Sequence, residues 1–255
     1  MGSYSNKNIV ITGASKGLGY HVALDLSKRG ANLALLSRDE DALIALTNKI
    51  GDKRHIYYAN DLLDTENTEE VAINILNHFD YKVDVILHAA GGGYGMHNPL
   101  ISSDNMYSLF MANLGGAINI NNIIVPHMIE VGSGNIIHIG SIASHEVTGS
   151  VGYNTIKSAV SAYVRTIGKE LSKSGIIVTG ILPGGFVAKD NAMVRLCDNK
   201  PDIYNNFIQE RLPRGYMGDV DELLPLIRLL SSNEASMMGG CMVPIDAGEG
   251  NAYIT

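Results

Sequence analysis

Short apolar runs alternate along the chain with longer segments in which apolar residues recur every three or four positions. The short runs predict strands at 8–11, 32–36, 54–59, 83–88, 136–139 and 176–182, and a last strand and turn over 241–248. The longer segments predict a helix that leaves the glycine loop 12–19 and runs to about 29, and further helices at about 65–79, 102–131, 153–173 and 219–230. This order predicts one α/β domain over residues 1–255: a doubly wound parallel sheet of about seven strands with helices on both faces.

The predicted helix from 153 carries Tyr153 and Lys157, four residues apart and therefore on one helical face. A phenol has an ordinary pKa near ~10, and lowering it by about 3 units requires roughly 4 kcal/mol of preferential stabilisation of the phenolate. A lysine ammonium one turn away is the right charge to supply much of it. The same spacing also occurs in ordinary surface pairs, so the neighbouring sequence has to show whether this pair is catalytic.

Twelve residues before Tyr153 lies Ser141, just beyond the predicted strand 136–139. A serine there faces the crevice at the carboxyl end of the sheet, where open α/β sheets bind ligands. Near the amino terminus, Thr12-Gly-x-x-x-Gly-x-Gly19 follows the first strand and leads into a helix, the placement expected of a phosphate-binding loop.

These motifs together resemble the short-chain dehydrogenase/reductase family, and the chain is similar to its 3-oxoacyl-carrier-protein reductases. The resemblance implies a Rossmann fold and hydride transfer between a nicotinamide and a carbonyl or secondary alcohol. It makes Tyr153 the general acid or base, Ser141 the donor to the carbonyl oxygen, and Lys157 the group that lowers the pKa of Tyr153 and binds the nicotinamide ribose. It gives Asn113 a place in a proton path. Reaction direction stays open.

The resemblance also implies the cofactor and substrate residues. The predicted cofactor-binding set is Gly13, Ser15, Lys16, Gly17, Leu18, Gly19, Arg38, Asp61, Leu62, Ala90, Gly91, Tyr153, Lys157, Pro183, Gly184, Phe186 and Val187. The predicted substrate set is Gly93, Tyr94, Ser141, Tyr153 and Gly185. Two positions depart from the family: His88-Ala-Ala-Gly91 replaces Asn-Asn-Ala-Gly, and Ala188 stands where a threonine often binds the carboxamide. The first departure puts the usual bracing of the central sheet in doubt.

The cofactor preference is read from the end of the second strand, where the fold meets the adenosine ribose. An acidic residue there favours NAD, but this chain has Ser37 and Arg38, with Lys16 as a second cation. Because the arginine fork suits phosphate oxygens, NADP(H) is favoured over NAD(H). Asp39 and Glu40 keep NAD open, although their charges also suit the amino end of the next helix.

Composition limits the partners. A net charge of −7 argues against nucleic acid and anionic membranes, and the apolar stretches break before the ~20 residues of a spanning helix. Two cysteines and no signal-peptide pattern predict a cytoplasmic protein. Eight scattered histidines predict no metal site. The family's usual contacts through helices 102–131 and 153–173 imply a homodimer or homotetramer.

The segment of about 189–215 lacks clean periodicity and is the expected substrate lid. Its mixed charges suit a polar substrate such as a phosphorylated or nucleotide-linked sugar. The alternatives are a 3-oxoacyl-carrier-protein reductase, which calls for a basic docking face, and a catalytically silent dinucleotide-sensing regulator, a class that commonly loses the tyrosine or lysine.

Overall fold

Seven parallel strands form the central sheet of the computed structural model, which describes residues 4–51 and 54–252. Their order is β3-β2-β1-β4-β5-β6-β9, so the winding direction reverses between β1 and β4. The bounds are β1 Asn8–Thr12, β2 Asn32–Ser37, β3 Ile56–Ala59, β4 Val85–His88, β5 Gly134–Ile139, β6 Ile176–Pro183 and β9 Met242–Ile245. The predicted sheet is confirmed, with the third and fourth strands each beginning two residues later than expected.

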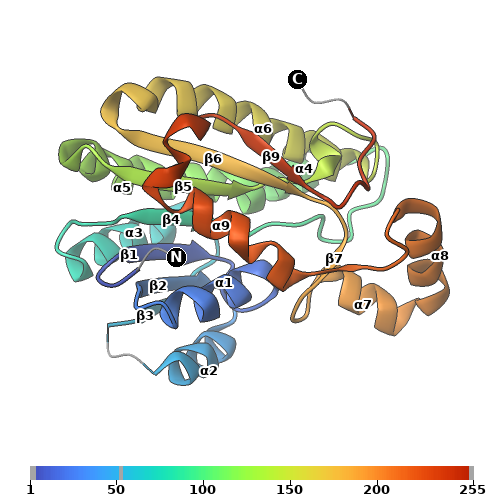
Figure 1. Ribbon diagram of the computed structural model, residues 1–255, viewed down its shortest axis with the longest axis horizontal. Coiled ribbons are helices and arrows are strands. Elements are labelled where there is room, and N and C mark those ends of the chain that lie inside the picture. The colour runs from blue at the N-terminus through green and yellow to red at the C-terminus, as the bar shows by residue number, and fades with distance from the viewer. Residues whose placement is uncertain (1–3, 52–53, 253–255) are drawn as a thin grey trace.

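Each strand contributes apolar side chains to both faces of the sheet, as the side-chain alternation of a strand requires. In β1, Ile9 and Ile11 pack with α1 (Gly17–Ser27), α2 (Glu40–Ile50) and α9 (Leu224–Leu230), which cover one face. Val10 belongs to the opposite core, with α3 (Thr65–His78), α5 (Gly116–Val131) and α6 (Val151–Leu171). Figure 1 shows the sheet between these two helical layers.

The predicted helix 102–131 is one continuous helical segment with a wider turn inside it. It consists of α4 (Ser103–Phe110), a π-helical turn at Met111–Gly115, and α5. Pro126 lies inside α5, so the helix does not end there. The segment is long and apolar enough to cross a membrane by length and composition alone, but 67% of its most apolar window is buried inside the fold. That burial is what a core helix of this sheet requires.

The expected lid is helical. Between β6 and α9 the chain forms β7 (Phe186–Val187), α7 (Ala192–Asn199), α8 (Pro201–Arg211) and β8 (Gly218–Asp219). Strands β7 and β8 pair with each other and close the base of this excursion. In Figure 1, α7 and α8 stand apart from both helical layers. Local capping explains the helices that periodicity missed: Asn191 caps α7, and Pro201 provides the fixed φ of a first helical turn.

Four short helical turns complete the description. They are Ile142–Ser144 after β5, Ser172–Ser174 after α6, Val220–Glu222 before α9 and Asn233–Met238 before β9. Asp219, where the predicted helix 219–230 begins, caps the turn Val220–Glu222, because its side chain and that of Glu222 form a reciprocal capping box.

Candidate active site

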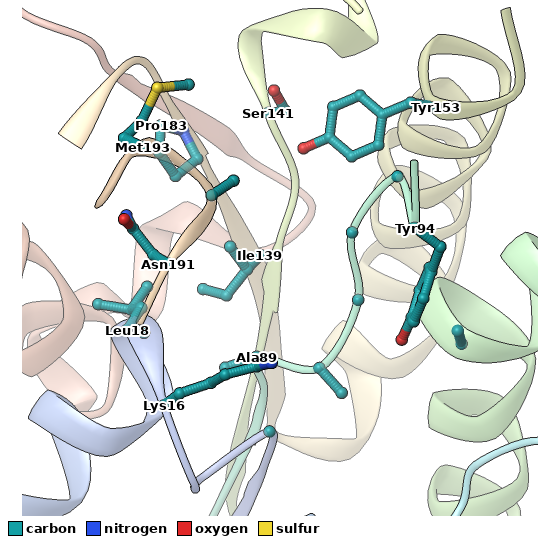
Figure 2. Close-up of a pocket in the computed structure, with 18 of the residues that line it drawn as sticks. Lys16, Leu18, Ala89, Tyr94, Ile139, Ser141, Tyr153, Pro183, Asn191 and Met193 are labelled. Carbon is teal, nitrogen blue, oxygen red and sulfur yellow. The ribbon is translucent and has the colours of Figure 1, made fainter. Parts of the chain in front are cut away.

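Tyr153 and Ser141 meet at the carboxyl end of β5. Ser150 caps α6 through a hydrogen bond from the Tyr153 amide, which places Tyr153 in the first turn of the helix. The phenol points toward the Ser141 hydroxyl (Figure 2), and a hydrogen bond joins these two side chains. A Cβ built on Gly93 would lie 3.6 Å from the Tyr153 ring, so the loop after β4 packs directly against the phenol. The predicted pair therefore shares one site.

Lys157 lies one turn further along α6, on the same side as Tyr153. Its Nζ is 5.7 Å from the centroid of the Tyr153 ring and donates a 2.8 Å hydrogen bond to the carbonyl of Ile139. The side chain is 4% exposed. The predicted helical face is confirmed: the phenol and the ammonium point into the same part of the molecule.

The expected acidification of the Tyr153 phenol by Lys157 is wrong for the structure described. Burial raises the pKa of Tyr153, and the hydrogen bond with Ser141 opposes that rise. Burial also lowers the pKa of Lys157 to about 8, because a desolvated ammonium is costly. Desolvation is thus the largest influence on both groups and favours the neutral form of each. The resulting protonated phenol is the form that can donate a proton.

Asn113 fastens the loop after β4 to the π-helical turn. Its Oδ1 accepts from the Gly92 amide at 2.9 Å, and its Nδ2 donates to the carbonyls of Gly92 and Leu109 at 3.1 and 2.9 Å. A Cβ on Gly91 would collide with Asn113 Oδ1. The side chain does not line the cavity, so it positions the loop, and its place in a proton path stays a prediction.

The glycine loop between β1 and α1 is shaped by close backbone approach. Gly13 has φ +69°, and a Cβ there would lie 2.7 Å from the Ala90 amide nitrogen. A Cβ on Gly19 would collide with the Gly13 carbonyl. These contacts bring the loops after β1 and β4 together without side chains between them. The backbone is therefore open to a phosphate group near the amino end of α1.

One cavity of about 840 Å³ runs past all of these groups, within the size range of ligand sites in proteins. It is lined by most of the predicted cofactor residues: Gly13, Ser15, Lys16, Gly17, Leu18, Arg38, Asp61, Leu62, Ala90, Gly91, Tyr153, Lys157, Pro183, Gly184 and Phe186. Gly93, Ser141 and Gly185 of the substrate set also line it. Gly19 and Val187 do not, because Gly19 packs behind Gly13 and Val187 lies in the β7–β8 pair.

Tyr94 lines the cavity but not as the expected substrate wall. Its ring lies 5.5 Å from the Arg38 guanidinium, and Figure 2 shows it directed away from Ser141 and Tyr153. Arg38 Nη1 lies 3.9 Å from Asp61 Oδ2. These three side chains form the end of the cavity where β2, β3 and β4 finish.

The lid adds cavity residues that sequence reasoning missed. Arg211 of α8 forms a 3.1 Å ion pair with Glu249, whose other oxygen accepts a 2.6 Å hydrogen bond from the Gly185 amide. The Glu249 side chain is 3% exposed. Burial raises the pKa of Glu249, and the Gly185 and Arg211 contacts oppose that rise. Glu249 follows the end of the last strand, β9, by four residues. A carboxylate so close to the carboxyl end of a parallel strand was the sequence signal that could have placed it at the site.

Asn191 is a second missed residue. Its Nδ2 donates to the Phe186 carbonyl at 2.7 Å and its Oδ1 accepts from the Val194 amide at 3.0 Å. Phe186 belongs to the predicted cofactor set, and its carbonyl is already bonded to Asn191. The lid is also tied to the glycine loop, because the Gly17 amide donates to the Lys189 carbonyl at 2.7 Å.

His88 replaces the family's bracing asparagine with a different buried network. Its Nε2 lies 2.9 Å from Asn121 Oδ1, and Asn121 Nδ2 donates to the Tyr163 hydroxyl at 3.2 Å. His138, its register partner on β5, stacks beside it with ring centroids 4.6 Å apart. Burial lowers the pKa of His88 to about 4 and holds the pKa of His138 well below its usual range. His88 thereby connects β4 to α5 and, through Asn121, to α6.

Over residues 4–51 and 54–252, no group of three or more His, Cys, Asp or Glu side chains is placed to hold a metal ion. The cavity instead combines a glycine-lined backbone channel, a protonated phenol with a serine beside it, and a buried lysine. These features suit a dinucleotide lying beside a proton donor.

Residues 7–196 match the profile of the short chain dehydrogenase family. The chain belongs to that family. Among curated relatives, 2-dehydro-3-deoxy-L-rhamnonate dehydrogenase (NAD(+)) of a Sphingomonas strain is 28% identical over 92% of each chain. The 3-oxoacyl-[acyl-carrier-protein] reductase of Haemophilus influenzae is 25% identical over 95% of this chain and 97% of the relative. The crystal structure of levodione reductase superposes with a TM-score of 0.89 at 23% identity, covering 98% of this chain and all of that one.

This short-chain dehydrogenase is thus an oxidoreductase that acts on alcohol or carbonyl substrates with a nicotinamide cofactor. Ser141, Tyr153 and Lys157 are all present and share one cavity, which argues against the silent regulator. The preference for one nicotinamide cofactor and the choice of substrate depend on the residues that line this chain's cavity.

Proposed function

We propose that the protein is an NADP(H)-dependent oxidoreductase that interconverts a polar, sugar-derived carbonyl compound and its secondary alcohol. The observation that carries the cofactor preference is the end of β2. Arg38 lines the cavity there, whereas the next residue, Asp39, does not line it and instead caps α2 by accepting from the Ala42 amide at 3.0 Å. The carboxylate of Asp39, which would favour NAD, is thus engaged by the α2 backbone. Arg38 is the side chain at this strand end that would bind a ribose 2′-phosphate.

The chain's own groups supply the proton chemistry. When bound, the nicotinamide supplies or accepts a hydride. Tyr153 donates its phenolic proton to the carbonyl oxygen in reduction and takes it back in oxidation. Ser141 donates a hydrogen bond to that oxygen as negative charge develops on it. Lys157 lies within the same face of α6 and would hold the nicotinamide ribose.

The cofactor preference is tested by measuring kcat/KM for NADPH and NADH with the same carbonyl substrate. We expect at least a tenfold preference for NADPH, because a charge-assisted contact to phosphate is worth about 1.5–3 kcal/mol. Arg38→Leu should remove most of that preference while leaving kcat/KM for NADH within about twofold. A clear preference of the wild type for NADH would show that the Arg38 argument is wrong.

The Arg211–Glu249 pair supports a polar substrate. An arginine donates and a carboxylate accepts, so together the two groups match hydroxyl groups, which do both. The pair lines the cavity that also holds Ser141 and Tyr153. The Sphingomonas relative is named for a sugar acid, 2-dehydro-3-deoxy-L-rhamnonate. That relative is named as an NAD(+) enzyme, so the cofactor proposal rests on this chain's residues alone.

Arg211→Met is expected to lower kcat/KM for keto-sugars by roughly 10- to 100-fold, the loss of one charge-assisted hydrogen bond. An apolar ketone such as cyclohexanone should lose less than about threefold. Lys200→Met is the matched control, because Lys200 is an exposed lid cation outside the cavity. An equal loss for both substrate types would show that Arg211 supports the lid and does not select the substrate.

A 3-oxoacyl-carrier-protein reductase is the second candidate, supported by the Haemophilus influenzae relative. Acyl thioesters compared with keto-sugars under NADPH distinguish the two, and we expect the keto-sugars to be the better substrates. We also propose that the protein is cytoplasmic and associates as a homodimer or homotetramer through α4–α5 and α6, without nucleic acid or membrane as a partner.

A further inference from the structure

Tyr94 occupies an unusual backbone position at the rim of the cavity. It follows Gly91–Gly93 and has φ +51°, in the left-handed region that a residue with a bulky side chain rarely adopts. Gly95, next to it, has φ +71°. The loop is thus built of residues that turn easily, with one aromatic residue held in the turn. A strained residue of this kind at a ligand site is a reason to look for a role.

The contacts of Tyr94 lie at the adenosine end. Its ring and the Arg38 guanidinium are 5.5 Å apart, within the range of a cation–π interaction. Arg38 is otherwise a long, 57%-exposed side chain, the kind that loses much conformational entropy when it binds. The ring limits where the guanidinium can move. Tyr94 thereby reduces the entropy that Arg38 has to lose when it binds a ligand.

The geometry also decides which part of Arg38 is available. The Arg38 Cζ lies over the Tyr94 ring, 5.5 Å from its centroid, and the five N–H donors of a guanidinium point outward in its own plane. Asp61 Oδ2 approaches one of these, Nη1, at 3.9 Å, beyond hydrogen-bond distance. The in-plane donors are therefore left for an acceptor in the cavity, and a phosphate monoester is the acceptor whose geometry fits them.

We propose that Tyr94 is a cofactor-specificity residue, whose ring holds the Arg38 guanidinium ready to bind the 2′-phosphate of the adenosine ribose. This inference rests on the proposed NADP(H) preference. Tyr94 then acts on one half of the cofactor only. It distinguishes the two nicotinamide cofactors at a position 56 residues away in sequence from Arg38, in a loop that faces the catalytic phenol through Gly93.

A stacking role on the adenine ring is the competing explanation, and the two have different consequences. Stacking on adenine would strengthen binding of every adenosine ligand equally, with or without a phosphate. Holding Arg38 strengthens only ligands that carry the 2′-phosphate. The discriminating probes are therefore 2′,5′-ADP and 5′-AMP, which share the adenine and the 5′-phosphate and lack the nicotinamide.

The experiment is calorimetric titration of both probes into the wild type, Tyr94→Phe, Tyr94→Ala, Arg38→Leu and the Tyr94→Ala/Arg38→Leu double variant. We expect Tyr94→Ala to weaken 2′,5′-ADP binding about tenfold and 5′-AMP binding less than twofold. Tyr94→Phe, which keeps the ring, should bind both like the wild type. In the Arg38→Leu background, Tyr94→Ala should have no further effect on 2′,5′-ADP.

If the wild type prefers 2′,5′-ADP, two results for Tyr94→Ala overturn the inference and leave the proposed cofactor preference intact. In one the variant weakens the binding of both probes equally, and in the other it weakens the binding of neither. Additive losses in the double variant would overturn it as well, because the two side chains would then act separately. A wild type without preference for 2′,5′-ADP would instead refute the NADP(H) proposal, and the inference with it. Circular dichroism of each variant separates any of these outcomes from misfolding.

Discussion

Tyr153→Phe is expected to lower kcat for carbonyl reduction by a factor on the order of 10³, since a positioned general acid contributes about 10²–10⁴. Phenylalanine keeps the ring that packs against Gly93, so the fold and the cavity should be preserved. The dissociation constant for NADPH, measured by fluorescence titration, should change by less than about threefold. Steady-state NADPH oxidation at 340 nm gives kcat.

Tyr163→Phe is the matched control for this experiment. It removes a hydroxyl from the same helix, α6, but one that receives a hydrogen bond from Asn121 and lies outside the cavity. Its kcat should stay within a few-fold of the wild type. If Tyr153→Phe turned over at a near-normal rate, the proton would have to come from another group, and the assignment of Tyr153 would be refuted.

Acid is expected to destabilise the fold through the buried histidine pair. The pKa of His88 falls on folding from about 6.5 to about 4 because burial disfavours the charged ring. Below pH 6.5 the unfolded chain therefore binds a proton that the folded chain refuses, and stability falls as the pH drops toward 4. A shift of this size corresponds to about 3 kcal/mol in total, of which roughly 2 kcal/mol is lost by pH 5. His138 acts in the same direction.

Urea unfolding at pH 7.5 and pH 5 measures this loss. His88→Asn should reduce the difference in unfolding free energy between the two pH values by about 2 kcal/mol, whatever its effect at pH 7.5. His145→Asn, which changes an exposed histidine, should leave the difference unchanged. A wild type equally stable at both pH values would show that His88 is not held neutral by burial.

The periodicity of the chain was enough to predict the sheet, because parallel strands buried on both faces give continuous apolar runs. The same logic placed Ser141 and Tyr153 at one end of the sheet. The helices of the lid were missed because both are short and neither contains a buried residue, so they lack the core-facing positions that reveal the longer helices. Their starts carry local signals instead: Asn191 caps α7, and Pro201 stands in the first turn of α8. Strong local capping can thus specify a helix that has little core to bury.

The site was predictable where a residue follows directly from a strand end, and not where distant segments meet. Glu249 lies 3.1 Å from Arg211, which is 38 positions earlier, and 2.6 Å from the Gly185 amide. No local sequence pattern predicts either contact. Tyr94 was assigned to the substrate because it follows a strand, but its side-chain direction depends on the turn formed by the glycines around it. The direction of the Tyr153 pKa shift was predicted wrongly for a related reason. The four-residue spacing reveals the Lys157 ammonium, but the burial that raises the pKa of Tyr153 depends on the folded chain.

Transfer of a hydride within this cavity is tested most directly by isotopic labelling. NADPH carrying deuterium at the transferable nicotinamide carbon, prepared separately for each of its two faces, is incubated with the enzyme and a keto-sugar that it reduces. We expect the alcohol formed to gain one mass unit at the former carbonyl carbon with one of the two labelled cofactors. Alcohol formed without label from either cofactor would contradict it.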